Sequence, residues 1–238
     1  QEYGRSDYGQ GKRVLVEFVS ANPTGPMHIG NARGGVLGDA LASVLDAAGY
    51  TVEREFYIND AGNQVNKFGV SLEARYLQLY KGEEAVPFPE DGYKGEDIIA
   101  HAKAFAELYG DKYVDAPEQE RRQALVDYAL PKNIQGLHDD LARYRVEYDN
   151  WFKESTLHEN GAVNRVVELL KEKGATYEKE GALWFHGEAY GSEDFVLVRG
   201  NGVPTYVVPD IAYHYGKLVG RGLDLAIAAL GPGHHRSV

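Results

Sequence analysis

The chain has 238 residues, of which 43% are hydrophobic and 26% are charged, a balance typical of a folded globular protein rather than a disordered or fibrous one. Its 25 Lys and Arg residues against 36 Asp and Glu residues give a net charge of −11, which excludes a protein that coats nucleic acid or an anionic membrane through bulk positive charge. The absence of cysteine excludes a disulfide framework, a thiolate metal site and a cysteine nucleophile. No apolar run is long enough to span a bilayer, and we expect a cytoplasmic location.

The first eighty residues have the pattern of a strand, a helix and a second strand. Residues 14–19 form a β-branched apolar run, which predicts a buried strand. Apolar residues then recur every three or four positions over 29–48, which predicts a helix that ends at Gly49. A second strand is expected over 52–58 and a second helix over 64–80. This order is typical of a βαβ crossover in a parallel sheet covered by helices.

The middle of the chain has a different character. Residues 81–117 are interrupted by proline and glycine, which indicates an insertion with short helices and loops. Helical periodicity returns over 118–144, where Pro131 predicts a kink or a break. A further amphipathic helix is expected over 163–173, before Gly174.

The last part of the chain returns to strands. Short apolar runs predict strands over 182–185, 195–198 and 205–208, the last two separated by a glycine-rich turn. A short helix is expected over 211–218, followed by a final buried strand over 225–230.

The strongest local feature is the loop between the first strand and the first helix. It contains Pro23, Gly25 and Pro26 and leads into His28 and Gly30 at the start of the helix. Free backbone N–H groups at a helix N-terminus favour a bound phosphate, and His28 adds a further donor. The alternative is a simple connector in which His28 only caps the helix. On physical grounds the two interpretations are about equally supported.

The same loop carries a family resemblance. Residues 26–31, Pro-Met-His-Ile-Gly-Asn, resemble the His-Ile-Gly-His signature of class I aminoacyl-tRNA synthetases, and residues 16–26 resemble the arginyl-tRNA synthetases in particular. Further segments resemble that family in the same order, and the likeness extends from about residue 12 to the end of the chain; these segments are 55–64, 149–155, 181–184 and 205–214.

The resemblance implies a fold and a reaction. The expected fold is α/β, a doubly wound parallel sheet of the Rossmann-like class I type with a mostly helical insertion. Residues 1–80 and 181–238 would form the two halves of the nucleotide-binding catalytic domain, and residues 81–180 the connective insertion. The implied reaction is activation of L-arginine by ATP to arginyl-adenylate, followed by transfer to the arginine tRNA, with Mg²⁺ carried on ATP and no protein metal site.

The resemblance also assigns residues to the arginine site. A guanidinium is a planar cation that pairs with carboxylates, and Glu17 and Asp210 match the family positions that recognise it. Tyr206 matches a tyrosine that packs near the same group. Ser20 and Asn22 match the positions that hold the α-amino and α-carboxylate end. Without the resemblance, Glu17 would be read as a solvent-facing or paired acid, Asp210 as a helix N-cap and Tyr206 as a sheet residue.

The ATP site is assigned in the same way. His28 and Asn31 match the catalytic signature, where His28 would stabilise charge on the phosphates during attack. Gly30 would let the nucleotide lie against bare backbone. Together with these three, Pro26 and His234 are the expected ATP contacts. Adjacent histidines such as His234 and the residue after it rarely share one ligand, so a metal role there is not expected.

Three departures from the family pattern bear on activity. Asn31 replaces the second signature histidine, Pro209 stands where a basic residue is usual, and the acid that normally precedes the two histidines near His234 is absent. The second class I signature, a Lys-Met-Ser-Lys loop, and the anticodon-binding domain would lie beyond Val238. We therefore expect a catalytic-domain fragment with an arginine pocket and low or no activity alone. The alternatives are a non-catalytic arginine-binding or regulatory module and, with less support, a related nucleotidyltransferase.

The charge is distributed unevenly along the chain. Residues 81–190 carry 14 basic and 23 acidic side chains, whereas residues 191–238 carry 4 of each. Nearly all of the net negative charge therefore lies in the middle of the chain, and the two expected catalytic halves are close to neutral. The overall charge still predicts weak tRNA affinity for this chain alone.

Overall fold

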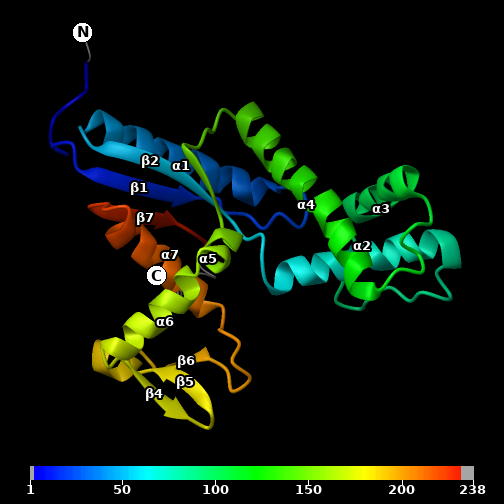
Figure 1. Ribbon diagram of the computed structural model, residues 1–238. Helices are drawn as coiled ribbons and strands as arrows, with labels where there is room; N and C mark the ends of the chain where they lie inside the picture. Colours follow the sequence, from blue (N-terminus) through cyan, green and yellow to red (C-terminus); the bar gives the residue numbers. More distant parts are fainter. Residues whose placement is uncertain (1–2, 232–238) are drawn as a thin grey trace. The chain divides into compact units, whose positions relative to one another are not determined.

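The computed structural model describes residues 3–231, which group into two compact units (Figure 1). The first unit contains the chain as far as Phe18, Leu37–Phe56 and the chain from Tyr148 onward. The second contains Val19–Val36 and Tyr57–Glu147. The expected division into two catalytic halves and an insertion over 81–180 stays a prediction.

A sheet of order β3-β2-β1-β7 forms the core of the first unit. Its central strand β1 pairs in parallel with β2 on one side and with β7 on the other, as the crossover pattern predicts (Figure 1). Four of the six residues of β1 are apolar and fully buried, which explains its continuous apolar run. The bounds are β1 Arg13–Phe18, β2 Thr51–Ile58, β3 Asn150–Lys153 and β7 Leu225–Ala229.

The first helix, α1 (Ile29–Ala47), lies where the periodicity predicts it, but its large apolar residues are not its buried face. The small residues Gly35, Gly38 and Ala42 are buried, whereas Leu37 and Val44 are exposed. A Cβ on Gly38 would lie 2.1 Å from the ring of Phe18 in β1. The helix packs against the strand through its glycine, because only glycine permits so close an approach.

The rest of the first unit carries helices and a small antiparallel sheet. The sheet has the order β4-β5-β6, of which β4 was not predicted. The elements are α5 Ser155–Glu159, α6 Ala162–Glu172, β4 Thr176–Lys179, β5 Ala182–Phe185, a short 3₁₀ turn Gly187–Tyr190, β6 Phe195–Val198, α7 Val207–Tyr215 and the π-helical turn η2 Gly216–Gly220.

The strand predicted over 205–208 is wrong, because α7 begins at Val207. Val207 and Val208 favour strands by propensity. Pro209, however, has no backbone N–H to donate to a neighbouring strand. At the third position of a helix this N–H has no intrahelical partner, so proline costs little there. The departure at Pro209 is therefore compatible with a well-formed α7.

The second unit is built around three helices, α2 (Asn63–Lys81), α3 (Glu96–Tyr109) and α4 (Glu118–Arg143). Their apolar faces meet in one core that includes Phe68, Tyr76 and Phe105. No break occurs at Pro131, which lies exposed inside the unbroken α4. The carbonyl that loses its partner belongs to Asp127, which is also exposed, so water can satisfy it.

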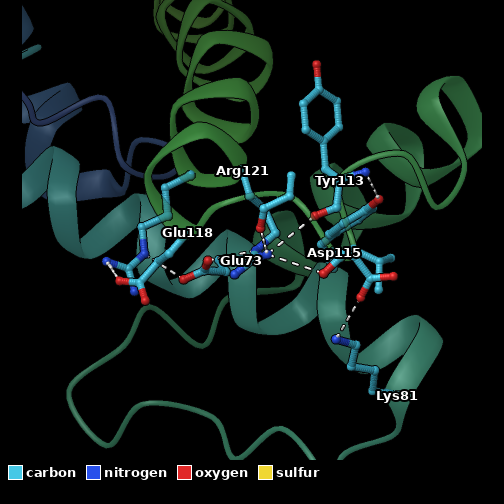
Figure 2. Close-up of polar contacts among 10 residues, drawn as sticks. Glu73, Lys81, Tyr113, Asp115, Glu118 and Arg121 are labelled. Atoms are coloured by element: carbon cyan, nitrogen blue, oxygen red, sulfur yellow. Dashed lines mark hydrogen bonds and ion pairs between the residues drawn. The ribbon is translucent and has the colours of Figure 1, made fainter.

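A buried ion pair fastens the start of α4 to α2 (Figure 2). Glu73 of α2 is 6% exposed and accepts hydrogen bonds from Nε of Arg121 at 2.8 Å and from Nε of Arg122 at 2.5 Å. Nη1 of Arg121 also donates to three carbonyls of the loop before α4, those of Tyr113, Val114 and Ala116. Arg121 therefore holds the 113–116 loop as well as the helix.

Candidate active site

Glu17 lies near the carboxyl end of the central strand β1, surrounded by apolar neighbours. It is 5% exposed, and its Oε2 accepts a hydrogen bond from Nζ of Lys217 at 2.6 Å. Lys217 lies in the π-helical turn η2 and is itself 1% exposed. A buried carboxylate needs a cation and hydrogen bonds to remain ionised, and Lys217 supplies both.

A second carboxylate stands beside Glu17 on the neighbouring strand. Glu55 of β2 is in register with Glu17 and is fully buried. It accepts hydrogen bonds from the hydroxyl of Tyr213 at 2.6 Å, from Nη1 of Arg221 at 2.6 Å and from Nδ2 of Asn150 at 2.5 Å. In-register residues of adjacent strands project from the same face of a sheet, so the two carboxylates form one cluster.

Tyr213 connects the two carboxylates. Its ring lies under the Lys217 ammonium, with Nζ 3.7 Å from the ring centroid. Burial raises the pKa of Tyr213 well above its ordinary value, and the charges of Glu17 and Glu55 raise it further. The phenol therefore stays protonated and acts as a donor. Burial also lowers the pKa of His214, with Lys217 acting in the same direction, so His214 adds no positive charge at neutral pH.

The cluster has an excess of negative charge. Arg221 also pairs with Glu53, so that three carboxylates, those of Glu17, Glu53 and Glu55, meet two cations, those of Lys217 and Arg221. The net charge of this set is −1. A further cation in its neighbourhood would be stabilised, whereas an anion would be repelled.

Asp210 lies in the first turn of α7, not at the end of a strand as predicted. It precedes Lys217 by seven residues, which is two helical turns, so both residues belong to one face of the α7–η2 segment. The N-cap position belongs to Tyr206, not to Asp210. Tyr206 is 70% exposed and is not a sheet residue. The structure thus connects the element that carries Asp210 and Tyr206 to Glu17 through Lys217.

The chain after β1 turns through an unusual backbone conformation. Val19 and Ser20 have φ values of 68° and 44°, in the left-handed region that a β-branched residue such as Val19 rarely adopts. Oγ of Ser20 accepts a hydrogen bond from the backbone N–H of Tyr57 at 3.1 Å, which holds the turn. Asn22 follows with an exposed side chain.

His28, Gly30 and Asn31 come together at the start of α1 as a reciprocal cap. Nδ1 of His28 accepts the Gly30 N–H at 3.2 Å, and Oδ1 of Asn31 accepts the His28 N–H at 3.0 Å. The two bonds resemble a capping box, except that the His28 ring accepts from the second amide of the helix instead of the third. A Cβ on Gly30 would lie 3.0 Å from the His28 ring, so glycine allows the ring to take this position.

The cap fixes the tautomer of the neutral His28 ring. Because Nδ1 of His28 accepts, the neutral ring carries its proton on Nε2. His28 is exposed, so Nε2–H can donate to a ligand while Nδ1 caps the helix. The two interpretations of His28, cap and phosphate donor, are therefore compatible. Asn31 keeps the acceptor that the cap requires, which explains why an amide can stand in the second histidine's place.

Among the remaining expected ATP contacts, Pro26 is exposed in the loop before α1, and His234 lies outside the described residues. The residues that the sequence interpretation missed are the partners of the two carboxylates. Tyr213, Lys217 and Arg221 are spaced four residues apart, and that spacing was the available signal for a polar helical face.

The chain matches the family model of class I arginyl-tRNA synthetase catalytic domains over residues 1–228. It belongs to that family. It is 61% identical to the arginine–tRNA ligase of Caldanaerobacter subterraneus subsp. tengcongensis over 239 aligned positions and 58% identical to that of Ruminiclostridium cellulolyticum. Each alignment covers 100% of this chain and 42% of the relative. The chain thus spans less than half the length of these relatives.

Solved structures show the same fold. A crystal structure assigned to an arginyl-tRNA synthetase from Campylobacter jejuni superposes with a TM-score of 0.87 at 36% identity, covering 98% of this chain and 51% of that one. The Thermus thermophilus arginyl-tRNA synthetase superposes with a TM-score of 0.60 at 26% identity, covering 87% and 36%. The α/β class I catalytic fold is therefore confirmed. Within residues 3–231, no helix is both long and apolar enough to cross a membrane.

The buried pair in this catalytic domain predicts strong energetic coupling. Lys217→Met and Glu17→Gln should each lower the free energy of unfolding by about 3–5 kcal/mol, because each leaves a buried charge without its partner. The double variant should cost clearly less than the sum of the two. Urea unfolding midpoints at constant slope measure these changes.

Lys171→Met in α6 is the matched control, because that lysine is 45% exposed and pairs with Glu168 at the surface. It should change the free energy of unfolding by less than about 1 kcal/mol. Costs for Lys217 and Glu17 that simply add would contradict a coupled pair.

Proposed function

We propose that the protein is an arginine–tRNA ligase whose arginine and ATP sites lie in this chain. In the first step a carboxylate oxygen of L-arginine attacks the α-phosphorus of ATP, the bond to the β-phosphate breaks, and pyrophosphate leaves. In the second step a ribose hydroxyl at the 3′ end of the tRNA attacks the arginyl carbonyl and AMP leaves. The observation that carries the proposal is the buried, net-negative carboxylate cluster around Glu17 in a chain that matches the family over residues 1–228.

Arginine recognition follows from the charge of that cluster. A guanidinium is a permanent planar cation, and a site with excess carboxylate charge favours it over a neutral side chain of the same shape. We assign Glu17 and Asp210 to the guanidinium and Tyr206 to its flat face. Ser20 and Asn22, in the turn after β1, are assigned to the amino-acid end of the substrate. Lys217 and Tyr213 hold Glu17 in place.

ATP recognition is assigned to the loop and cap before α1. The Nε2–H of His28 would donate to a phosphate oxygen, and the N-terminus of α1 would favour its negative charge. Pro26, Gly30, Asn31 and His234 complete the expected set. Within residues 3–231, no group of three or more His, Asp or Glu side chains forms a metal site. Independently of that, we assign Mg²⁺ to the phosphates of the nucleotide, with which it would arrive and where it would neutralise charge on the leaving group.

We infer that this chain alone activates arginine slowly, since it spans only 42% of the relatives' length. ATP–pyrophosphate exchange with L-arginine measures the step, and we expect a rate far below that of the ligases it resembles. Robust exchange by the chain alone would contradict this inference. Arginine binding without exchange, even by a full-length parent, would instead favour a binding or regulatory module. Affinity for tRNA should be weak and should fall further with salt.

The role of Asp210 predicts a charge-selective loss of affinity. Asp210→Asn should weaken L-arginine binding about tenfold or more, because a hydrogen bond to a charged group contributes about 1.5–3 kcal/mol. Isothermal titration should show that the wild-type chain binds arginine but not citrulline, its neutral analogue, or lysine. Asp139→Asn, an exposed substitution on α4, is the control and should leave affinity unchanged. Equal binding of arginine and citrulline would exclude carboxylate recognition.

The two roles of His28 can be separated by one substitution. Asparagine is a good N-cap residue, so His28→Asn should keep the stability of α1 within about 0.5 kcal/mol. It lacks the Nε2–H donor, so ATP binding should weaken about tenfold. Titration with ATP and thermal unfolding measure the two effects. Unchanged ATP affinity would show that His28 acts only as a cap.

A further inference from the structure

The loop at residues 22–26 leads from the turn after β1 to the cap of α1. It contains Pro23 and Pro26, which have no backbone N–H, so the loop offers few donors of its own. It can be fastened to its surroundings mainly through its carbonyl oxygens. Pro23 and Thr24 are nonetheless buried, so a carbonyl here needs a partner within the protein.

Asn133 of α4 supplies that partner. Its Nδ2 donates a hydrogen bond to the carbonyl oxygen of Pro23 at 3.0 Å. Its Oδ1 lies 2.7 Å from Nε2 of His101 on α3. All three residues belong to the second compact unit. Two helices that lie far from the loop in sequence are thus connected to one of its carbonyls, α4 directly and α3 through Asn133.

The donors and acceptors in this chain of hydrogen bonds can be assigned in only one way. A carbonyl oxygen can only accept, so Asn133 must present its amide nitrogen to Pro23 and its oxygen to His101. His101 must then donate from Nε2, in either the neutral Nε2–H form or the protonated form. The Pro23 carbonyl therefore fixes which way the Asn133 amide faces, and a donor on Nε2 of His101 supports the same orientation.

Asp97 of α3 also lies close to the same loop. Asp97 lies one helical turn before His101, and its Oδ2 is 3.7 Å from the position that a Cβ would take on Gly25. That oxygen is buried and has no hydrogen-bond partner among the described residues. α3 thus lies close to the loop at Gly25, two residues beyond the carbonyl that Asn133 holds.

We propose that Asn133 is a positioning residue for the substrate loop and that His101 supports the orientation of its amide. Held at Pro23, the loop keeps Asn22 on one side and Pro26 and His28 on the other in their binding arrangement. The substrate part of this inference rests on the proposed function, whereas the fastening of the loop does not. The helices α3 and α4 would then act on this loop through one amide.

Hydrogen exchange of the full chain tests the fastening without any ligand. Asn133→Asp keeps the size of the side chain but presents an acceptor to the Pro23 carbonyl, so the hydrogen bond is lost. Amides within residues 19–28 should exchange about tenfold faster, with α3 and α4 unchanged. His101→Leu should give a smaller increase, and His101→Gln, which restores a donor at the same position, should return exchange to the wild-type rate.

Gln135→Ala, an exposed neighbour of Asn133 on α4, is the matched control and should leave the loop unchanged. Unchanged loop exchange in Asn133→Asp would overturn the proposal, and so would an increase spread equally over α2, α3 and α4, which would indicate a merely structural role. Titration with ATP should show about tenfold weaker binding by Asn133→Asp. Asn133→Asp could speed loop exchange even if the wild-type chain bound neither ATP nor arginine. That combination would support the role of Asn133 in holding the loop and would contradict the proposed function.

Discussion

The ion pair between Glu17 and Lys217 is the interaction on which the rest of the first unit depends. Glu17 stands in a strand whose neighbouring residues are apolar and fully buried, where a lone carboxylate would be strongly destabilised. The ammonium must therefore reach the carboxyl end of β1. This requirement fixes the position of η2, and with it the face of α7 that Tyr213 and Asp210 share. Together with the hydrogen bonds of Glu55 to Tyr213 and Arg221, this contact holds the helix, the turn and the two central strands in one arrangement.

The same constraint explains why this end of the sheet suits a cation. A fold that needed only stability could neutralise Glu17 with Lys217 and bury nothing else that is charged. Instead, a second carboxylate, that of Glu55, lies in register with Glu17. Glu55 pairs with Arg221, which also forms an ion pair with Glu53. Buried pairs of this kind often contribute little net stability compared with apolar packing. Their retention at the carboxyl end of a parallel strand, where open α/β sheets bind ligands, is better explained by recognition than by stability.

Much of the fold could be predicted from the sequence because local patterns decide it. Local sequence predicts several elements correctly. The apolar run predicts β1, the periodicity predicts α2, and the proline- and glycine-containing segment predicts the loop before α1. The errors arise where tertiary contacts override local preference. Val207 and Val208 favour a strand, but they begin a helix whose later residues must reach Glu17. In α1 the large apolar residues are exposed, because the small residue Gly38 is what fits against Phe18 of β1.

The site could be predicted only in part, for a related reason. His28, Gly30 and Asn31 are adjacent in sequence, so a motif reveals them. The partners of Glu17 and Glu55 are 95 to 200 residues away, and no local pattern pairs them. Likewise, nothing in the sequence around Pro23 indicates Asn133, which lies 110 residues later and reaches the loop only once α3 and α4 have packed. The motif indicates the residues that we assign to substrate, whereas the fold determines the residues that hold them.

The account's central claim is that a buried Lys217 ammonium holds Glu17 beside the arginine site. Nuclear magnetic resonance of the chain labelled with ¹⁵N at lysine Nζ tests it most directly. The account predicts one slowly exchanging ammonium signal that disappears in Lys217→Met and shifts when L-arginine is added but not when citrulline is added. An ammonium that exchanges as fast as those of surface lysines, or a protected signal that ignores arginine, would contradict it.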